Sequence, residues 1–286
     1  MKLIEKANAK VNLALKITGV RDDGYHLLDM VLMETGLYDT LELESSGQGI
    51  TIEAPEGLPL GMDNTAYKAA SVYFRKTGVQ GGAHIRLHKQ IPGRAGLGGD
   101  SSDAAAVLRL LNRMHYNVES GRPSLSDLHT IAPQVGADVS FFLMGGVQRC
   151  KGIGEVLEHV KMAVPLHMVI LTPNEGLSTP EVYREYDRQP SDTGGDTGRV
   201  VEALEKGDLA MLCREMFNDL EAPAIQLYPI LPDIKSILMD HGAMGAMMSG
   251  SGTSVFGIFT SEEESREAAQ KIAEKHNDRF RLIYAQ

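Results

Sequence analysis

Residues 91–106 read Ile-Pro-Gly-Arg-Ala-Gly-Leu-Gly-Gly-Asp-Ser-Ser-Asp-Ala-Ala-Ala. Four glycines and two serines lead directly into residues that favour helix. Glycine adopts positive φ and lets backbone N–H groups approach a ligand closely. The free amides of a first helical turn attract phosphate. A tight turn without a ligand is the simpler alternative, but it needs fewer glycines. Because no Gly-Lys-Ser/Thr ends the loop, the segment predicts a nucleotide cradle that differs from the Walker type.

Composition narrows the classes of protein to consider. The chain has 286 residues, 43% of them hydrophobic, which is enough for one large domain or two smaller ones. Its formal net charge of −10 disfavours binding to nucleic acid. No stretch approaches the roughly 18 apolar residues of a membrane helix. Cys150 and Cys213 provide neither a disulfide framework nor zinc-ligand spacing. We therefore expect a cytoplasmic protein without nucleic-acid or membrane partners. We further expect a monomer or a weak homodimer.

Periodicity predicts the elements of the first half. Val11, Leu13, Leu15 and Ile17 alternate with polar or small residues, which predicts a strand with one buried face and with Lys10 and Asn12 on one side. Asn64 and Gly78 are the expected N-cap and stop of a helix. Asp103 is expected to be an N-cap or first-turn acid of the helix that follows the glycines. The predicted elements are strands at 40–44 and 83–87 and helices at 64–76 and 124–132, the last ending before Pro133.

The second half alternates strands and helices. The polar segment 187–199 is expected to be a loop. Strands are predicted at 166–172, 243–248, 254–260 and 280–284, and helices at 200–205, 209–216, 234–241 and 262–276. The order β, α, β, β, α, β is that of a ferredoxin-like sandwich. We place a domain boundary near residue 160, giving domains 1–160 and 161–286.

Four other sites each have two interpretations, one structural and one chemical. The run 248–254 is a hairpin turn or a second wall of the phosphate or substrate site. Lys10 is a surface charge or a catalytic cation. Asp138 is a helix N-cap or a carboxylate that, paired with a lysine, deprotonates an acceptor hydroxyl. Tyr25 and His26 are turn residues or a pair that stacks on a nucleobase and recognises its edge.

Together these pieces resemble the GHMP kinases over nearly the whole chain. Within that family they resemble most the kinases that act on 4-diphosphocytidyl-2-C-methyl-D-erythritol in the non-mevalonate isoprenoid pathway. The resemblance rests on Ala9-Lys10-Val11-Asn12-Leu13, Gly24-Tyr25-His26, Asp63-Asn64, residues 92–105, Gly136-Ala137-Asp138-Val139, Ser178-Thr179-Pro180, Phe217-Asn218-Asp219-Leu220-Glu221 and Ser249-Gly250-Ser251-Gly252.

The resemblance implies an α+β fold of two domains. The first is an ATP-binding, ribosomal-protein-S5-like N-domain, and the second is a ferredoxin-like C-domain. It implies an ATP-dependent phosphotransferase that uses Mg²⁺ and has an alcohol group as acceptor, the 2-hydroxyl of CDP-methylerythritol. Another small-molecule GHMP kinase and a non-catalytic ATP-binding homologue remain the alternatives.

The same resemblance assigns roles residue by residue, and it assigns no metal ligand. Asp138 matches the catalytic base and Lys10 its partner. The residues matched to ATP are Asn64, Pro92, Gly93, Arg94, Ala95, Gly96, Leu97, Gly98, Gly99, Asp100, Ser101 and Ser102. Those matched to the acceptor substrate are Asn12, Tyr25, His26, Ile153, Pro180 and Tyr183.

The chain departs from the family pattern at Asp100 in the glycine loop and at three positions outside this loop. Asp100 stands where the family usually has glycine, Ser140 where it has proline, and Thr253-Ser254 where it has Pro-Thr. A carboxylate about 4 Å from a phosphate charge would cost roughly 4 kcal/mol at an effective dielectric of 20. We therefore expect the carboxylate of Asp100 to face solvent; the alternatives are that it supports Mg²⁺ or that it weakens ATP binding.

Overall fold

The computed structural model describes residues 2–115, 125–190 and 192–286. The chain forms two compact units, called unit 1 and unit 2. Strands β1 (Lys2–Val20) and β2 (His26–Ser46) are long, and each continues from one unit into the other. Unit 1 comprises Met1–Ala9, Gly36–Ile91 and Gly98–Gly145, and unit 2 comprises Lys10–Thr35, Pro92–Leu97 and Gly146–Gln286.

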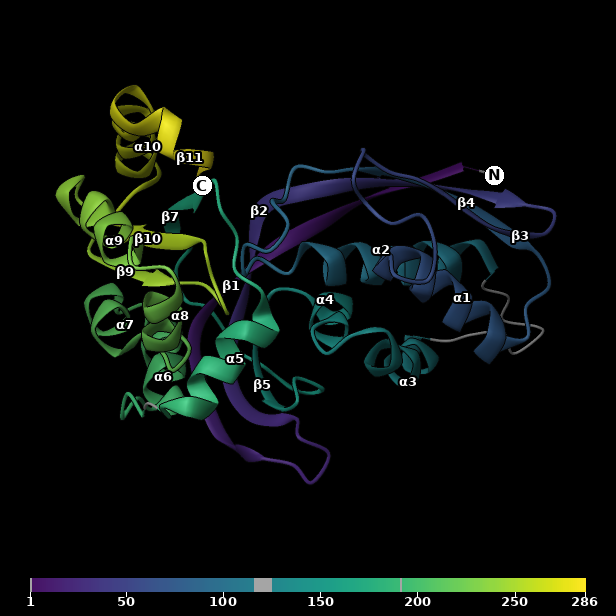
Figure 1. The fold of residues 1–286 in the computed structure, drawn as a ribbon, viewed down its shortest axis with the longest axis horizontal. Coiled ribbons are helices and arrows are strands. Elements are labelled where there is room, and N and C mark those ends of the chain that lie inside the picture. The colour runs from purple at the N-terminus through teal and green to yellow at the C-terminus, as the bar shows by residue number, and fades with distance from the viewer. Residues whose placement is uncertain (1, 116–124, 191) are drawn as a thin grey trace. The chain divides into compact units, whose positions relative to one another are not determined.

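Unit 1 pairs its strands with helices (Figure 1). The second part of β2 runs antiparallel to β4 (Gly82–His88), and β3 (Gly49–Glu53) runs parallel to β4. Helix α1 (Thr65–Thr77) makes the crossover between β3 and β4 and contacts both strands. The remaining helices of the unit are α2 (Gly99–His115), α3 (Leu125–Val135) and α4 (Val139–Met144).

Local signals set the ends of α1 as the sequence predicts. The Asn64 side chain accepts hydrogen bonds from Ala66 N and Tyr67 N, and Gly78 has a φ of +66°. The prediction for the next helices is less accurate. Pro133 lies inside α3 rather than after it. It lies exposed in the last turn of that helix, and proline donates no backbone hydrogen bond there. The predicted start of α3 at Ser124 lies outside the described residues.

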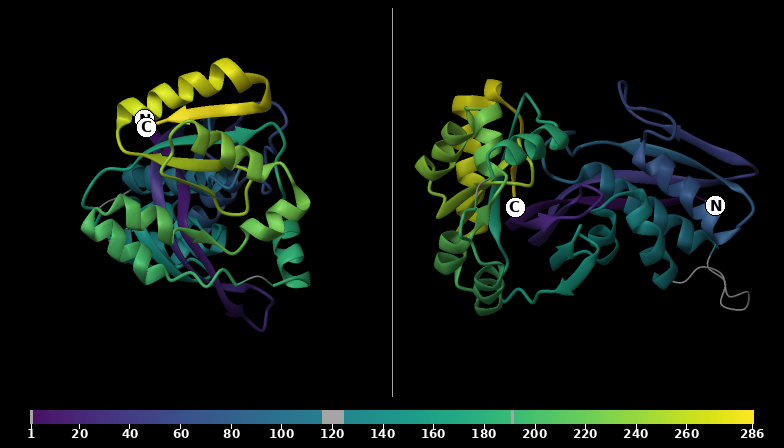
Figure 2. Two further views of the ribbon diagram at one scale, coloured as in Figure 1. Left: turned by 90° about the vertical axis from the view of Figure 1, so that its left-hand side faces the viewer. Right: turned by 60° about the horizontal axis from the view of Figure 1, so that its bottom comes forward.

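The C-terminal part of unit 2 is a four-stranded antiparallel sheet. Its strands stand in the order β11-β7-β10-β9, which is the ferredoxin-like arrangement that the sequence predicts. The strands are β7 (His167–Pro173), β9 (Gly245–Met248), β10 (Val255–Phe259) and β11 (Phe280–Ala285). Helices α9 (Leu231–Asp240) and α10 (Glu262–His276) contact this sheet, and Figure 2 shows α10 alongside β11.

The rest of unit 2 adds strands to the long β1 and β2. β8 (Phe217–Asn218) pairs in parallel with β1, and β5 (Val147–Gly152) joins β2 to β6 (Val156–His159). The loop predicted at 187–199 is shorter in the structure, because α5 extends to Arg188 and α6 begins at Thr197. The helices of this part are α5 (Thr179–Arg188), α6 (Thr197–Lys206), α7 (Leu209–Glu215) and α8 (Glu221–Leu227), and a short 3₁₀ helix covers Asn277–Arg279. No helix in the described ranges has the length and the hydropathy to cross a membrane.

Candidate active site

The first half of the glycine loop belongs to unit 2 and lies against a second glycine loop, residues 249–254. Gly96 has a φ of +74°, and a Cβ atom there would lie 2.0 Å from the carbonyl oxygen of Ser249. Ser249 Oγ donates a 3.0 Å hydrogen bond to the oxygen of Gly96, and Ser254 N donates one of 3.0 Å to the oxygen of Ala95. The two loops therefore touch through their backbones, which only glycine at position 96 permits. The second loop joins β9 and β10, as a hairpin turn would.

The second half of the loop belongs to unit 1 and opens α2. Gly98 has a φ of +72°, and its oxygen accepts a 2.9 Å hydrogen bond from Ser102 N. A Cβ atom at Gly99 would lie 2.9 Å from Cγ2 of Ile91, so the residues that precede and follow the loop are in contact. The first N–H groups of a helix have no partner within the helix and attract anions. In α2 these groups belong to Gly99, Asp100 and Ser101.

The predicted ATP residues differ in exposure. Ala95, Leu97 and Ser102 are buried, and Gly93, Arg94 and Asp100 are exposed. The carboxylate of Asp100 is 70% exposed, in agreement with the expectation that it faces solvent. Asn64 is the N-cap of α1, with its amide oxygen engaged by that helix. Whether these residues bind ATP stays a prediction.

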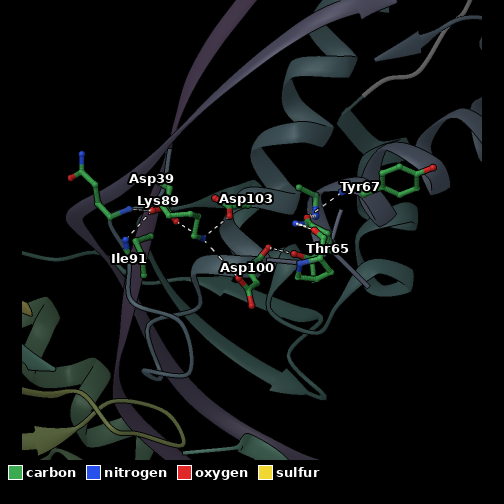
Figure 3. A network of polar contacts seen from close by, with 11 residues as sticks. Asp39, Thr65, Tyr67, Lys89, Ile91, Asp100 and Asp103 are labelled. Carbon is green, nitrogen blue, oxygen red and sulfur yellow. Dashed lines mark hydrogen bonds and ion pairs between the residues drawn. The ribbon is translucent and has the colours of Figure 1, made fainter. Parts of the chain in front are cut away.

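Lys89 is the centre of a cluster of charges at the start of α2 (Figure 3). Its Nζ lies 2.6 Å from Asp39 Oδ2 and 2.6 Å from Asp103 Oδ2. The side chains of Asp39 and Asp103 are 0% and 3% exposed. Burial raises the pKa of Asp103 to about 7 although Lys89 opposes the shift. Burial alone would lower the pKa of Lys89, but the two carboxylates outweigh that effect and raise it. The expected capping role of Asp103 is wrong: it is the fifth residue of α2 and binds Lys89 instead.

Lys10 and Asn12 are buried within β1. The prediction of one buried face fails at these positions, since Lys10 is 5% and Asn12 1% exposed. The second glycine loop covers them: a Cβ at Gly250 would lie 3.1 Å from Lys10 Nζ and 3.3 Å from Asn12 Oδ1. Lys10 Nζ donates a 2.5 Å hydrogen bond to Asn12 Oδ1, and Asn12 N donates one of 3.3 Å to Ser249 Oγ. The ammonium group is therefore held in a fixed place against that loop.

Asn218 explains how the second glycine loop keeps its shape. Its Nδ2 donates hydrogen bonds of 2.9 Å to the oxygen of Met248 and 2.8 Å to that of Gly250, and its Oδ1 accepts one of 3.0 Å from Leu220 N. Glu221 Oε2 accepts a 2.9 Å hydrogen bond from Met248 N. The motif Phe217–Glu221 thus supports the loop that covers Lys10.

Asp138 occupies the N-cap position of α4, but its side chain makes no capping hydrogen bond. The residue is partly exposed. The helix therefore leaves this carboxylate available for another role. Lys10 and Asp138 belong to different units, and their pairing stays a prediction.

An aromatic cluster surrounds His26, in which the ring of Tyr183 lies 4.7 Å from the His26 ring and that of Tyr186 lies 6.0 Å away. Nε2 of His26 lies 2.8 Å from Asp187 Oδ1. Tyr25 is 62% exposed, and Pro180 stands in the first turn of α5, the helix that carries Tyr183. Ile153 is partly exposed, with its N–H bound to Glu155. The structure thus brings His26 and Tyr183 together.

The chain is similar to known proteins over most of its length. The model of the GHMP kinases N terminal domain matches residues 64–146, and the model of the GHMP kinases C terminal matches residues 200–280. A protein of Pelotomaculum thermopropionicum named 4-diphosphocytidyl-2-C-methyl-D-erythritol kinase is 42% identical over 93% of this chain and 92% of its own length. The chain belongs to the GHMP kinase family. The predicted domain boundary near residue 160 stays a prediction.

Two further family members are similar over almost their full length. The protein of the same name from Desulfitobacterium hafniense strain Y51 is 40% identical over 93% of this chain and 89% of its own. A crystal structure of 4-(cytidine 5'-diphospho)-2C-methyl-D-erythritol kinase has a TM-score of 0.82 and 35% identity. The match covers 99% of this chain and 98% of the chain in that crystal structure. The two-domain GHMP kinase fold is therefore shown.

Sequence reasoning missed Asp39, Lys89, Tyr186 and Asp187. The first two lie 50 residues apart in the chain and carry no local motif. Tyr186 and Asp187 fall at the end of α5, a helix that the sequence analysis did not predict. The spacing of three to four residues from Val182 and Tyr183 to Tyr186 is the sequence signal that could have indicated this helix.

Proposed function

We propose that this chain is an ATP-dependent kinase that phosphorylates the 2-hydroxyl of 4-diphosphocytidyl-2-C-methyl-D-erythritol in the cytoplasm. Relatives that carry the name of this enzyme are 40% and 42% identical over 93% of the chain. The structure with that name, at a TM-score of 0.82, supports the same choice of acceptor. This assignment places the chain in the non-mevalonate isoprenoid pathway.

One observation carries the ATP site: the glycine loop delivers the open N-terminus of α2. Positive φ at Gly96 and Gly98 turns the backbone there, and the first amides of α2 follow at once. Such an N-terminus binds phosphate through backbone N–H groups and the helix dipole. This is the arrangement that holds the terminal phosphates of a nucleotide without a Walker lysine.

Asp138 is the proposed general base and Lys10 the proposed catalytic cation. Asp138 accepts the proton of the hydroxyl while the substrate oxygen bonds to the γ-phosphorus. The bond from that phosphorus to the bridging oxygen breaks, and ADP leaves. Positioning and charge stabilisation dominate such a transfer. The absence of a capping bond at Asp138 and the fixed, buried ammonium of Lys10 support these roles.

The cytidine end is proposed to bind beside His26. The exposed ring of Tyr25 and the ring of Tyr183 offer surfaces on which a base can stack. Asp187 holds His26 through Nε2 and so leaves Nδ1 for the edge of the base. Ile153 and Pro180 are proposed as apolar neighbours. Asn12, next to Lys10, is proposed to contact the acceptor end.

A ligand for Mg²⁺ has to come from the oxygen donors of the described residues. The described residues contain no group of three or more His, Cys, Asp or Glu side chains that could hold a metal. Mg²⁺ typically retains water and binds substrate phosphates with one or two protein oxygens, so it needs no such cage. Ser102 fits as one oxygen ligand: its buried hydroxyl, in the first turns of α2, has no hydrogen-bond partner among the described residues. When bound, Mg²⁺ neutralises charge on the β- and γ-phosphates.

The test is ADP release by the purified protein with Mg-ATP and a panel of alcohols. We expect release with CDP-methylerythritol and none with methylerythritol phosphate, homoserine or mevalonate. ADP release with another alcohol and not with CDP-methylerythritol would refute the acceptor. ATP binding without release with any alcohol would identify a non-catalytic homologue.

A further inference from the structure

The first half of the glycine loop, residues 93–97, turns its carbonyl oxygens towards other residues of unit 2. Three of these oxygens accept hydrogen bonds of 2.9 to 3.0 Å: Ala95 O from Ser254 N, Gly96 O from Ser249 Oγ and Leu97 O from Lys10 N. The oxygen of Arg94 packs on Gly176, where a Cβ atom would lie 2.7 Å from it. The oxygen of Gly93 accepts a 2.7 Å hydrogen bond from Nη2 of Arg281. Every carbonyl of this half of the loop is therefore held by the protein.

The amides of the same residues have no such partners. Within the part of the chain that the structure describes, no backbone N–H group of residues 93–97 donates a hydrogen bond. This is uncommon for residues as buried as Ala95 and Leu97, since more than about 90% of buried amides in proteins are paired. In a planar trans peptide the N–H group points away from the preceding carbonyl. Holding the oxygens on one side turns the amides to the other, as in the backbone nests that bind anions.

Arg281 reaches the loop from an irregular point of β11. The register of β11 against β7 shifts between Phe280 and Leu282, so that Arg281 is an extra residue in the strand. A bulge of this kind bends the strand and can re-aim a side chain. The guanidinium group of Arg281 makes no ion pair with a carboxylate in the described ranges. Its hydrogen bond goes instead to Gly93, at the start of the loop.

Arg94 is strained by the orientation of the peptide that precedes it. Its φ is +53°, and among the described residues it is the one non-glycine residue in the left-handed region. For an L-residue this conformation carries a penalty of about tenfold in population. A flip of the peptide between Gly93 and Arg94 relieves the strain, because it rotates φ of Arg94 towards the extended region. The flip also turns the oxygen of Gly93 to the side of the free amides, where it repels a phosphate. The hydrogen bond from Arg281 opposes this flip.

We propose that Arg281 is a positioning residue for the donor nucleotide: it holds the peptide between Gly93 and Arg94 so that the amide of Arg94 faces a phosphate of ATP. The proposal rests on the ATP site of the proposed function. Arg281 acts through the backbone of the loop and is not itself a ligand of the nucleotide. Its effect therefore depends on the residue at position 94, since glycine adopts a left-handed φ without strain and leaves nothing for the flip to relieve.

The experiment is calorimetry of Mg-ATP binding, without acceptor substrate, to the wild type, Arg281→Ala, Arg94→Gly and the double variant. When the strain is unopposed, about one molecule in ten keeps the competent peptide, so Arg281→Ala should raise the Kd about tenfold in the wild-type background. With glycine at position 94 the two orientations are about equally populated, so Arg281→Ala should raise the Kd only about twofold. The difference between the two factors is the coupling that a double-mutant cycle isolates.

Control variants separate this role from charge and from packing. Arg279→Ala removes the same charge two residues earlier and should leave the Kd unchanged, because Arg279 has no described bond to the loop. Arg281→Met keeps an apolar stem but donates no hydrogen bond. It should give the same two factors as Arg281→Ala, and it carries the test if Arg281→Ala does not fold.

Equal factors in the two backgrounds would overturn the proposal, because a direct contact of Arg281 with phosphate and a purely structural role both predict that result. Binding of ATP by Arg281→Ala like that of the wild type would overturn it as well. Failure of the wild type to bind ATP would instead refute the proposed function, and this inference with it.

Discussion

Replacing Gly96 by alanine probes the contact between the two glycine loops. A Cβ at this position would lie 2.0 Å from the oxygen of Ser249, whereas such contacts essentially never fall below 3.0 Å, so one loop must move by about 1 Å. A left-handed φ of +74° costs an L-residue about 1–2 kcal/mol. Overpacking adds about 1–3 kcal/mol. We therefore expect the free energy of unfolding to fall by about 2–5 kcal/mol.

The same substitution should reduce catalysis more than its effect on stability suggests. A misplacement of about 1 Å near the reacting groups typically costs about 100-fold in rate. The assay is kcat/KM for ATP at saturating CDP-methylerythritol, together with urea denaturation. Gly47→Ala is the control, because Gly47 is exposed outside the proposed site and no heavy atom lies within 4 Å of its Cβ position. If Gly96→Ala keeps kcat/KM within twofold and unfolds like the wild type, the loops do not make this contact in solution.

Three other outcomes follow from the site. Asp138→Asn should bind ATP normally and lose about 10²–10⁴-fold in kcat, because it removes the base; unchanged turnover would exclude Asp138 from that role. Asn218→Ala should lower the free energy of unfolding by about 2–4 kcal/mol, since the oxygens of Met248 and Gly250 lose their donor; a urea midpoint equal to that of the wild type would contradict this. The contribution of Asp103 to stability should fall as pH rises from about 4 to about 7, because its folded pKa lies above the ordinary 3.8 and the unfolded chain releases the proton first. Urea denaturation at several pH values should show this slope in the wild type and not in Asp103→Asn.

Elements with local signals were predictable from the sequence. Asn64 and Gly78 mark the ends of α1 because capping depends on neighbouring residues only. The four strands of the ferredoxin-like sheet were found from periodicity, and their order follows from the chain order of such a sandwich. The glycine loop was found because its backbone requirements limit which residues can occupy it.

Features that depend on distant contacts were not predictable. Lys10 reads as a residue on the polar face of a strand, and it is buried because residues 249–254 cover that face. Asp103 reads as a helix cap, and it binds Lys89 from a different part of the chain. Burial on a second face and long-range ion pairs leave no periodic pattern in the sequence. The partner residues must be known before either can be inferred.

The course of β1 sets a limit on how this enzyme can be divided. Residues from Lys10 onward in that strand pair with Phe217 and bind Ser249 and Asp219, all of which lie far beyond residue 160. A fragment that ends near residue 160 would contain β1 without these partners. The fragment that begins there would contain β8 without β1, the strand with which β8 pairs. Split-protein versions with the break at that point should therefore regain activity only when both fragments are expressed together.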